Sequence, residues 1–197
     1  MNKELIYVDE QDCIVGFGEK IQTHKDGHLH RAFSLFIYDK DKKRFLLQRR
    51  NENKYHSGGK WSNACCSHPY KNETWYESLQ RGVSDELNLS LDICEDINCD
   101  SKTLPQFLDN KLFFAGSFIY FSNYEDLCEH ELDYVFIYVI DTAIQDINFN
   151  ESEISALKWL TLSEIAEWIK KYPNDFSSWF NNAFHLVKKS LRSLNKK

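Results

Sequence analysis

Two apolar runs joined by a charged segment constrain the fold of this chain more than any other feature. Residues 31–39 read Arg-Ala-Phe-Ser-Leu-Phe-Ile-Tyr-Asp, and a second apolar run follows at residues 44–48. Short runs of aromatic and aliphatic residues are typical of β-strands, and the Asp-Lys-Asp-Lys-Lys segment at 39–43 is typical of a turn. The two runs therefore predict a β-hairpin.

Three helices are expected after the hairpin, over residues 75 to about 89, after residue 161, and over residues 177 to about 194. Thr74 and Glu77 have the spacing of a capping box, in which a hydroxyl and a carboxylate accept hydrogen bonds from free N–H groups at a helix start. Thr161 and Glu164 repeat this spacing and indicate the start of the second helix.

Three further strands are expected, over residues 112–121, 133–140 and 156–160. Strands and helices are thus intermixed, which indicates the α/β or α+β class with a mixed sheet. A chain of 197 residues suffices for one domain that buries roughly 70% of its unfolded surface. We expect a single domain over residues 1–197, with an N-terminal extension to about residue 30, a core over about 31–172 and the C-terminal helix.

The charge balance limits the partners of the chain. The formal net charge of -6 argues against a general nucleic-acid-binding protein, because no broad basic excess is available to neutralise phosphates. The basic residues Arg49, Arg50, Lys54 and Lys60 still permit a small anionic ligand. No apolar run approaches the roughly 20 residues of a membrane span. We expect a protein that binds no nucleic acid and no membrane, and that is a monomer.

The cysteines indicate the compartment and a candidate site. No signal peptide is recognisable at the start, so the six cysteines are interpreted as reduced thiols of a cytoplasmic protein. Residues 61–69, Trp-Ser-Asn-Ala-Cys-Cys-Ser-His-Pro, combine a nucleophile and base with a metal ligand, and form either a site or a loop with buried cysteines. Cys94 and Cys99 have the spacing of half a zinc knuckle, but without a second pair ordinary buried thiols are favoured.

A second polar group indicates a metal site. His24, His28 and His30 precede the first long strand, and Glu129 and Glu131 fall on the same side of a later strand because side chains alternate. Imidazoles together with carboxylates suit Zn²⁺ or Mn²⁺, whereas carboxylates alone suit Mg²⁺. The alternative is that the two glutamates are an exposed strand start.

The helix expected at residue 75 contains a modified catalytic motif. Residues 81–88, Arg-Gly-Val-Ser-Asp-Glu-Leu-Asn, resemble the Nudix box, whose core reads Arg-Glu-x-x-Glu-Glu-x-Gly and whose acids hold Mg²⁺ for diphosphate hydrolysis. Glu86 matches fully, but Gly82, Asp85 and Asn88 depart from the pattern. The resemblance implies a Nudix fold in which the acids that activate water are depleted.

Two motifs together resemble one Nudix subfamily, the type 1 isopentenyl-diphosphate delta-isomerases. They are residues 61–69 and the Glu-His-Glu-Leu-Asp-Tyr sequence at 129–134. Shorter similarities lie at residues 19–24, 30–34, 50–54 and 176–179, so that the resemblance covers most of the chain. It implies a Nudix-like mixed sheet sandwiched by helices, and an isomerase of isoprenoid biosynthesis that interconverts isopentenyl diphosphate and dimethylallyl diphosphate. The alternative function is a Nudix hydrolase that cleaves a diphosphate bond.

The same resemblance implies two metal ions. One Zn²⁺ or Mn²⁺ would be bound by His24, His30, His68, Glu129 and Glu131. His28 is a rival to His24 because the spacing to His30 varies in the family. One Mg²⁺, bound together with the substrate diphosphate, would be held by Glu86.

The resemblance also implies the catalytic and substrate-binding residues. Cys66, which lies two residues before His68, matches the catalytic thiol, and Glu131 matches the second catalytic group. We expect Glu131 as the acid and Cys66 as a thiolate that accepts a proton, with the order of transfer left open. Tyr120 is a candidate for a hydroxyl near the thiol. The expected substrate contacts are Lys20, Arg50, Lys54 and Ser67 on the diphosphate and Trp179 over the hydrocarbon, with Arg81 as a further basic candidate.

Overall fold

The computed structural model describes residues 3–93, 104, 111–141 and 146–194. Cys94 and Cys99 lie outside this range. Within it the chain forms, in order, β1 (Glu4–Val8), β2 (Ile14–Glu19), α1 (Lys20–Asp26), β3 (His30–Asp39), β4 (Arg44–Arg50), β5 (Trp61–Asn63), β6 (Cys65–Ser67), α2 (Trp75–Leu87), β7 (Leu112–Tyr124), β8 (Leu127–Ile140), β9 (Ile154–Thr161), α3 (Leu162–Lys171), the 3-10 turn η1 (Pro173–Asp175) and α4 (Phe180–Leu194).

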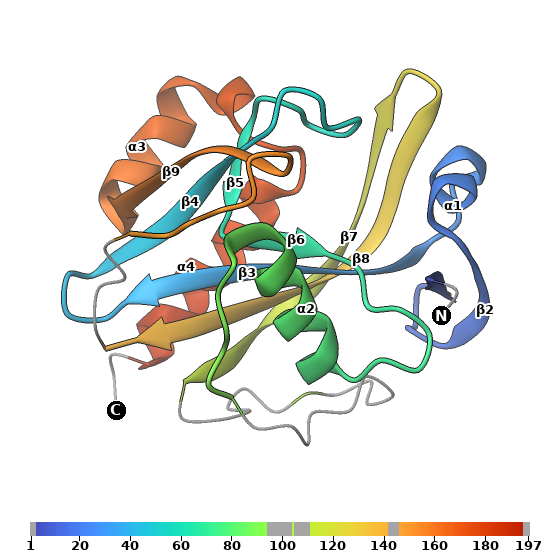
Figure 1. The fold of residues 1–197 in the computed structure, drawn as a ribbon, viewed down its shortest axis with the longest axis horizontal. Coiled ribbons are helices and arrows are strands. Elements are labelled where there is room, and N and C mark those ends of the chain that lie inside the picture. The colour runs from blue at the N-terminus through green and yellow to red at the C-terminus, as the bar shows by residue number, and fades with distance from the viewer. Residues whose placement is uncertain (1–2, 94–103, 105–110, 142–145, 195–197) are drawn as a thin grey trace.

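The sheet is mixed and is organised around β3 (Figure 1). Along one edge β3 pairs in parallel with β8 over its whole length, from His30 opposite Glu131 to Asp39 opposite Ile140. Along the other edge it meets β1, β6 and β4 in turn, all antiparallel. Strand β7 extends the sheet beyond β8, and β5 and β9 both pair with β4. The predicted hairpin of β3 and β4 and the expected mixed sheet are confirmed.

Helices cover both faces of the sheet, as expected (Figure 1). On one face α2 packs Trp75, Leu79 and Val83 into a cluster with Phe33 and other side chains of the sheet. On the opposite face α4 packs Phe180, Ala183, Phe184, Val187 and Leu191 into a second cluster. Burial of each large apolar side chain stabilises the fold by roughly 1.5–3 kcal/mol, so these two clusters fix the sheet that carries the site.

Both predicted capping boxes are present. Thr74 and Glu77 cap α2, and Thr161 and Glu164 cap α3. Helix α2 ends at Leu87, two residues earlier than expected, because Asn88 adopts a left-handed conformation with φ of 51°.

Helix α4 begins at Phe180 and not at residue 177. Ser177 lies in the segment between η1 and α4, and its N–H donates to the carbonyl of Trp61 at the start of β5. That connection places residues 177–179 beside the cysteine-rich segment. The expected start of the last helix was therefore three residues too early.

The N-terminal 30 residues carry elements that the sequence analysis did not predict, namely β1, β2 and α1. Asp12 anchors them, because it accepts a hydrogen bond of 2.7 Å from Arg31 Nε and a second one from the Tyr134 hydroxyl, all three side chains lying in the interior. A buried ion pair that is also hydrogen-bonded can hold two segments in a single arrangement. This anchoring brings α1, with His24, against β8.

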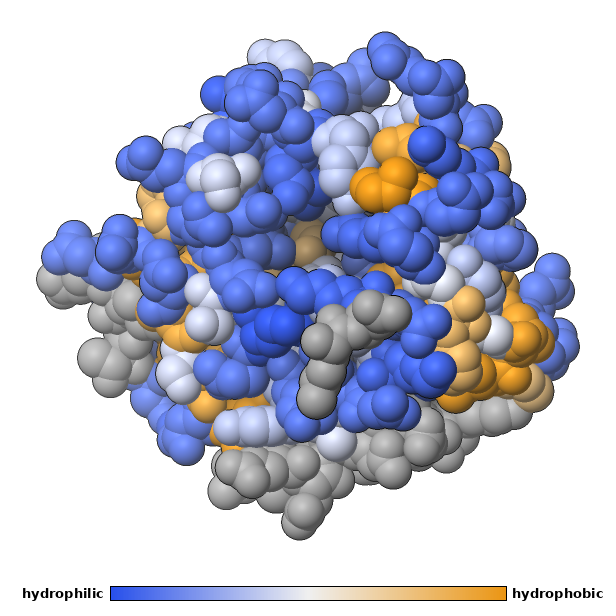
Figure 2. All heavy atoms as spheres, turned by 45° about the vertical axis from the view of Figure 1, so that its right-hand side comes forward, coloured by the Kyte–Doolittle hydropathy of each residue, from blue (hydrophilic) through white to orange (hydrophobic). Residues whose placement is uncertain are grey.

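Hydrophilic side chains predominate on the face shown in Figure 2, with apolar side chains gathered in a few patches. The part of the chain that the structure describes contains no helix with the length and apolar character needed to cross a membrane.

Candidate active site

A cavity of about 190 Å³ opens between α1, α2, β6 and β8. All of the predicted site residues except His30 line it: Lys20, His24, Arg50, Lys54, Cys66, Ser67, His68, Glu86, Tyr120, Glu129, Glu131 and Trp179. His30 lies directly behind His24, with 4.9 Å between the two ring centroids. The site therefore combines residues from Lys20 to Trp179, which span 160 positions of the sequence. The parallel β3–β8 pair and the N-terminal anchor bring these residues together.

Four side chains at one end of the cavity form a group of metal-ligand type. One donor atom from each of His24, His30, His68 and Glu131 lies within 4.8 Å of all the others, and the four residues are buried. The register of the sheet contributes to this arrangement, because His30 on β3 stands directly opposite Glu131 on β8.

The imidazoles of this group are oriented for ligation. His24 Nδ1 lies 2.6 Å from the carbonyl of Lys20, and His30 Nδ1 lies 2.8 Å from the carbonyl of His28. Because a carbonyl only accepts, the Nδ1 of His24 and of His30 each carry a proton, so Nε2 is the atom that can bind a metal ion. Both Nε2 atoms are buried and without a hydrogen-bond partner in the described part of the chain. Metal-binding histidines are commonly held in this way by a backbone carbonyl.

The charge state of the group also fits a metal ion. Burial lowers the pKa of His24 to about 4 and the pKa of His68 well below its usual range, so both rings are neutral at pH 7. Burial by itself raises the pKa of Glu131, but the neighbouring His30 and His68 imidazoles bring it well below the usual range. Three imidazoles and one carboxylate are a donor set that suits Zn²⁺ or Mn²⁺. The residues therefore fit the predicted metal.

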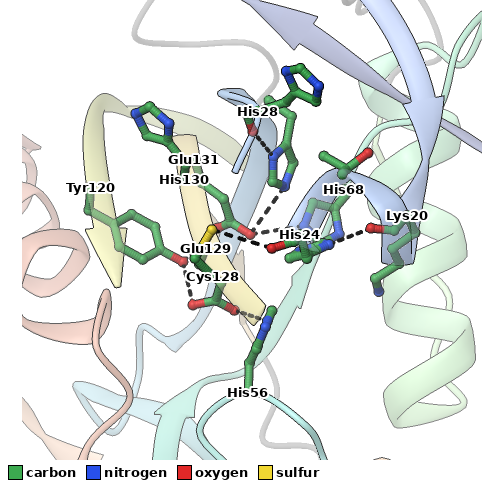
Figure 3. Close-up of polar contacts among 12 residues, drawn as sticks. Lys20, His24, His28, His56, His68, Tyr120, Cys128, Glu129, His130 and Glu131 are labelled. Carbon is green, nitrogen blue, oxygen red and sulfur yellow. Dashed lines mark hydrogen bonds and ion pairs between the residues drawn. The ribbon is translucent and has the colours of Figure 1, made fainter. Parts of the chain in front are cut away.

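Glu129 lies beside this group but outside it. Both glutamates are 5% exposed, so the alternative of an exposed strand start is wrong. Oε1 of Glu129 is 2.9 Å from His56 Nδ1, and its Oε2 accepts a hydrogen bond of 3.0 Å from the Tyr120 hydroxyl. Figure 3 shows Glu129 between these two side chains.

His28 does not join the group. Its ring is exposed, stacks on Tyr7 with 4.5 Å between centroids, and is directed away from the other histidines in Figure 3. Strand β3 begins at His30, so His28 precedes the alternation that would have placed it on the same face. His24, two residues before the end of α1, takes the position instead.

The two adjacent cysteines face opposite sides of β6. Cys65 is fully buried and packs in the α2 cluster, whereas Cys66 lines the cavity. The thiol of Cys66 donates to Asn63 Oδ1 at 3.2 Å. Burial, and next the charge of Glu86, raise the pKa of Cys66 to about 12. Burial and Glu86 therefore favour the neutral thiol, whereas the sequence analysis expected a thiolate.

Tyr120 contacts the carboxylates. Its hydroxyl is 2.6 Å from Glu131 Oε2 and 3.0 Å from Glu129 Oε2, and burial raises its pKa well above the usual value, so it remains a donor. The expected role beside the thiol stays a prediction, and the structure adds a contact with Glu131. The reason is the β7–β8 pairing, which places Tyr120 directly opposite Glu131.

Basic side chains gather at the other end of the cavity. The Arg50 guanidinium lies over the Trp179 ring, 5.2 Å from its centroid. Lys54 forms an ion pair with Glu153. Lys20 also lines the cavity, but it lies beside His24 at the metal-binding end. Arg81 donates to Ser67 Oγ at 3.4 Å, which supports its place among the basic residues of the site.

Glu86 lies at this basic end of the cavity. Burial raises its pKa to about 7, and the side-chain amide of Gln48 donates to its Oε2 at 2.7 Å. Trp179, which is 3% exposed, is fixed by a hydrogen bond of 3.2 Å from its Nε1 to Asn63 Oδ1. The cavity thus has a part with basic side chains, where Glu86, Asp85 and Glu153 are acids of the kind that suits Mg²⁺, and an aromatic wall.

Packing explains why a glycine occupies position 82, where the Nudix box has a glutamate. A Cβ at this position would lie 2.9 Å from Phe33 Cζ and 3.0 Å from Cys65 Sγ, closer than buried atoms pack. The core beneath α2 therefore has no room for the missing glutamate. This depletes the set of acids that a hydrolase of this fold would use.

Several polar residues at or near the cavity were not predicted as site residues, among them Asp133, His56 and Asn63. Asp133 lines it two positions after Glu131, accepts a hydrogen bond of 2.8 Å from Ser34 and is 2% exposed. The alternation of the strand could have identified it. Asn63, which holds both Cys66 and Trp179, and His56 lie in segments without periodicity, and only the structure reveals their contacts.

Known proteins are similar to this chain over nearly its whole length. The NUDIX domain family matches residues 28–180. The chain is 37% identical to "Isopentenyl-diphosphate Delta-isomerase 2" of Aromatoleum aromaticum, over 99% of this chain and 91% of that protein. It is 35% identical to "Isopentenyl-diphosphate Delta-isomerase" of Aliivibrio fischeri, over 99% of this chain and all of that protein. The chain belongs to the isopentenyl-diphosphate delta-isomerase family.

Solved structures support the same fold. DR0079 from Deinococcus radiodurans superposes with a TM-score of 0.64 at 17% identity, covering 94% of this chain and 98% of that one. The MutT protein from Methanosarcina mazei gives a TM-score of 0.58 at 19% identity, covering 86% and 96%. At such identities the similarity shows the fold alone, and it confirms the expected Nudix class of mixed sheet and helices.

Proposed function

We propose that this protein is an isomerase that interconverts isopentenyl diphosphate and dimethylallyl diphosphate. The observation that carries the proposal is that a single cavity holds both Cys66 and Glu131, with Trp179 on its wall and basic residues at one end. The reaction adds a proton to an unactivated alkene, passes through a tertiary cation and removes a proton two carbons away. It therefore needs two proton carriers around one short hydrocarbon.

Cys66 and Glu131 are the two proton carriers in this proposal. The shifts of pKa described above give a neutral thiol and a carboxylate as the resting pair, so one group can give a proton while the other can take one. One proton enters the substrate and one leaves it, so the pair ends the turnover with its protonation states exchanged. A single proton transfer then restores the starting pair.

Tyr120 and Trp179 assist this exchange. The Tyr120 hydroxyl holds one oxygen of Glu131 and thereby orients the carboxylate. The indole of Trp179 stabilises the cation by a cation–π attraction of about 2 kcal/mol once water is excluded. Because Arg50 already lies against this ring, we place the diphosphate next to Arg50 and the hydrocarbon on the remaining indole surface.

The diphosphate would be bound by Lys20, Arg50, Lys54 and Ser67, with Arg81 behind Ser67. Glu86 would hold the Mg²⁺ that accompanies the diphosphate, which requires its ionised form. The basic side chains around it lower the cost of that charge, since Arg50 and Lys54 both act against the rise of its pKa.

His24, His30, His68 and Glu131 would hold the Zn²⁺ or Mn²⁺ ion, with Glu129 as the adjacent fifth ligand. When bound, the ion would act as a Lewis acid on the carboxylate of Glu131 and so change its affinity for a proton. His68 orients this carboxylate, because its Nε2 lies 2.9 Å from Glu131 Oε1.

The proposal also includes a monomer in the cytosol. Cys65, Cys66 and Cys128 are thiols without disulfide partners in the described part of the chain, and this supports a reducing compartment.

A direct experiment distinguishes the isomerase from a Nudix hydrolase. Purified protein is incubated with isopentenyl diphosphate, Mg²⁺ and Mn²⁺, and the products are followed by ³¹P and ¹H NMR. We expect dimethylallyl diphosphate with both phosphates retained. Release of monophosphate or inorganic phosphate would establish the hydrolase instead.

Two variants complete the experiment. Cys66→Ala should abolish the conversion, whereas Cys65→Ala should largely retain it, because Cys65 faces the core. Equal activities of the two variants would remove the thiol from the mechanism.

A further inference from the structure

A fourth buried histidine lies at the metal-binding end of the cavity, outside the four-residue group. His56, in the connection between β4 and β5, is 2% exposed and lines the cavity. Its Nδ1 lies 2.9 Å from Oε1 of Glu129, which Figure 3 shows as the contact that links the two side chains.

The contact fixes the tautomer of His56. In its ionised form, which is the form that binds a metal ion, the Glu129 carboxylate only accepts hydrogen bonds, so Nδ1 of His56 is then the donor. Oε2 of Glu129 lies 3.0 Å from the Tyr120 hydroxyl, but the single proton of that hydroxyl lies between it and Glu131 Oε2, which is closer at 2.6 Å. His56, at 2.9 Å, therefore supplies the shorter of these two contacts of Glu129. Side chains that orient a metal-binding carboxylate in this way are frequent around metal sites.

The His56 ring is itself held from three sides. Its centroid lies 4.7 Å from that of Tyr124, 4.6 Å from that of Tyr55 and 4.9 Å from that of His24. Tyr124 in turn shares a hydrogen bond of 2.8 Å with Ser57. These contacts connect the β4–β5 segment to the end of β7 and to α1, so that His56 has little freedom to leave Glu129.

Packing alone does not explain a histidine at this position. A buried imidazole is costly unless its polar atoms are bonded, and Nε2 of His56 has no hydrogen-bond partner in the described part of the chain. An imidazole at this position can form the contact with Glu129, whereas an apolar side chain could not.

We propose that His56 is a positioning residue of the metal centre, which holds the Glu129 carboxylate beside the group of His24, His30, His68 and Glu131. This inference rests on the proposed function only in assigning Glu129 to the metal. It adds a residue outside the predicted ligand set, and it predicts that metal affinity depends on a side chain that does not itself bind the ion.

The test measures Mn²⁺ affinity directly. Metal-free wild-type protein, His56→Ala and His56→Asn are titrated with Mn²⁺, and the free ion is quantified by electron paramagnetic resonance. Loss of a residue that orients a ligand typically weakens affinity roughly 10–100-fold, and we expect this for His56→Ala. His56→Asn should recover most of the loss, because its amide N–H can take the place of Nδ1–H.

The control variant is His28→Ala, which removes a nearby but exposed imidazole. It should bind Mn²⁺ like the wild type. Wild-type affinity in both His56 variants would overturn the proposal, and so would an Asn variant as weak as the Ala variant while circular dichroism shows both folded. If His56→Ala does not fold, the comparison of His56→Asn with a His56→Leu variant decides in the same way.

Isomerase kinetics separate this proposal from the proposed function. The backbone carbonyl of His56 accepts a hydrogen bond of 3.1 Å from Arg50, and every variant keeps it. We therefore expect a lower kcat with little change in the KM for isopentenyl diphosphate. If the wild type has no isomerase activity but His56→Ala binds Mn²⁺ weakly, the proposed function is refuted and the positioning role is retained. If the wild type is an active isomerase but His56→Ala binds Mn²⁺ as tightly as the wild type, the positioning role is refuted and the function is retained.

Discussion

Replacing Glu86 by Gln should stabilise the metal-free protein, although it removes a residue of the site. Glu86 is buried at 7% exposure, and the Gln48 amide donates to it. A glutamine at position 86 keeps an oxygen that can accept this hydrogen bond and carries no charge. The substitution therefore isolates the cost of a buried carboxylate.

The magnitude follows from the pKa of Glu86, which burial raises from 4.5 to about 7. Below pH 4.5 the carboxyl is protonated in both the folded and the unfolded chain, and the neutral group makes its full contribution to the free energy of unfolding. As pH rises toward 7 the unfolded chain ionises first, so the folded state loses stability with respect to it. Linkage gives a loss of about 1 kcal/mol by pH 5.5 and about 3 kcal/mol by pH 8.5. Glu86→Gln avoids this loss.

The assay is thermal or urea unfolding of both proteins in a chelator at pH 5.5 and pH 8.5. For a chain of this size the expected rise in Tm for the variant is roughly 2–4 °C at the lower pH and roughly 6–12 °C at the higher pH. Titrating groups that do not interact with Glu86 are common to both proteins and cancel in the difference. A variant that is less stable at pH 8.5, or whose advantage does not grow with pH, would refute the reasoning about burial.

Three further predictions concern packing, metal binding and Tyr120. Gly82→Ala should destabilise the fold by about 1–2 kcal/mol in urea unfolding, because the clash with Phe33 outweighs the better helix propensity; a more stable variant would contradict this. Mn²⁺ at about 100 times its Kd should raise the Tm by roughly 5–10 °C, and a His24→Ala variant that keeps the same rise would exclude His24 as a ligand. Tyr120→Phe should lower the kcat of isomerisation roughly 10–100-fold through loss of the hydrogen bond to Glu131, and an unchanged kcat would show that the hydroxyl is not needed.

The long elements could be predicted from the sequence because their patterns are strong. The apolar runs of β3 and β4 and both capping boxes lie where we expected them. Strands β5 and β6 could not be predicted, since each has three residues and no alternation of apolar and polar side chains. Helix α1 is also short, and its start depends on Glu19, an uncommon capping residue.

The candidate site was predictable where a motif carried the information. Cys66 and Glu131 were identified by resemblance, and the structure places them in the same cavity. The protonation state of Cys66 could not be predicted from the sequence, because burial and the charge of Glu86 raise its pKa. Both of these depend on the tertiary structure. His56 was missed for a related reason, since its partner Glu129 lies 73 positions later in the chain.

The central claim is that Cys66 and Glu131 exchange protons with the hydrocarbon of the substrate. The most direct measurement is the location of deuterium after a limited incubation of isopentenyl diphosphate with the protein in deuterated water. We predict dimethylallyl diphosphate with one deuterium in a methyl group, and no deuterium uptake by Cys66→Ala or by Glu131→Gln. Product without deuterium, or undiminished uptake in either variant, would contradict the account.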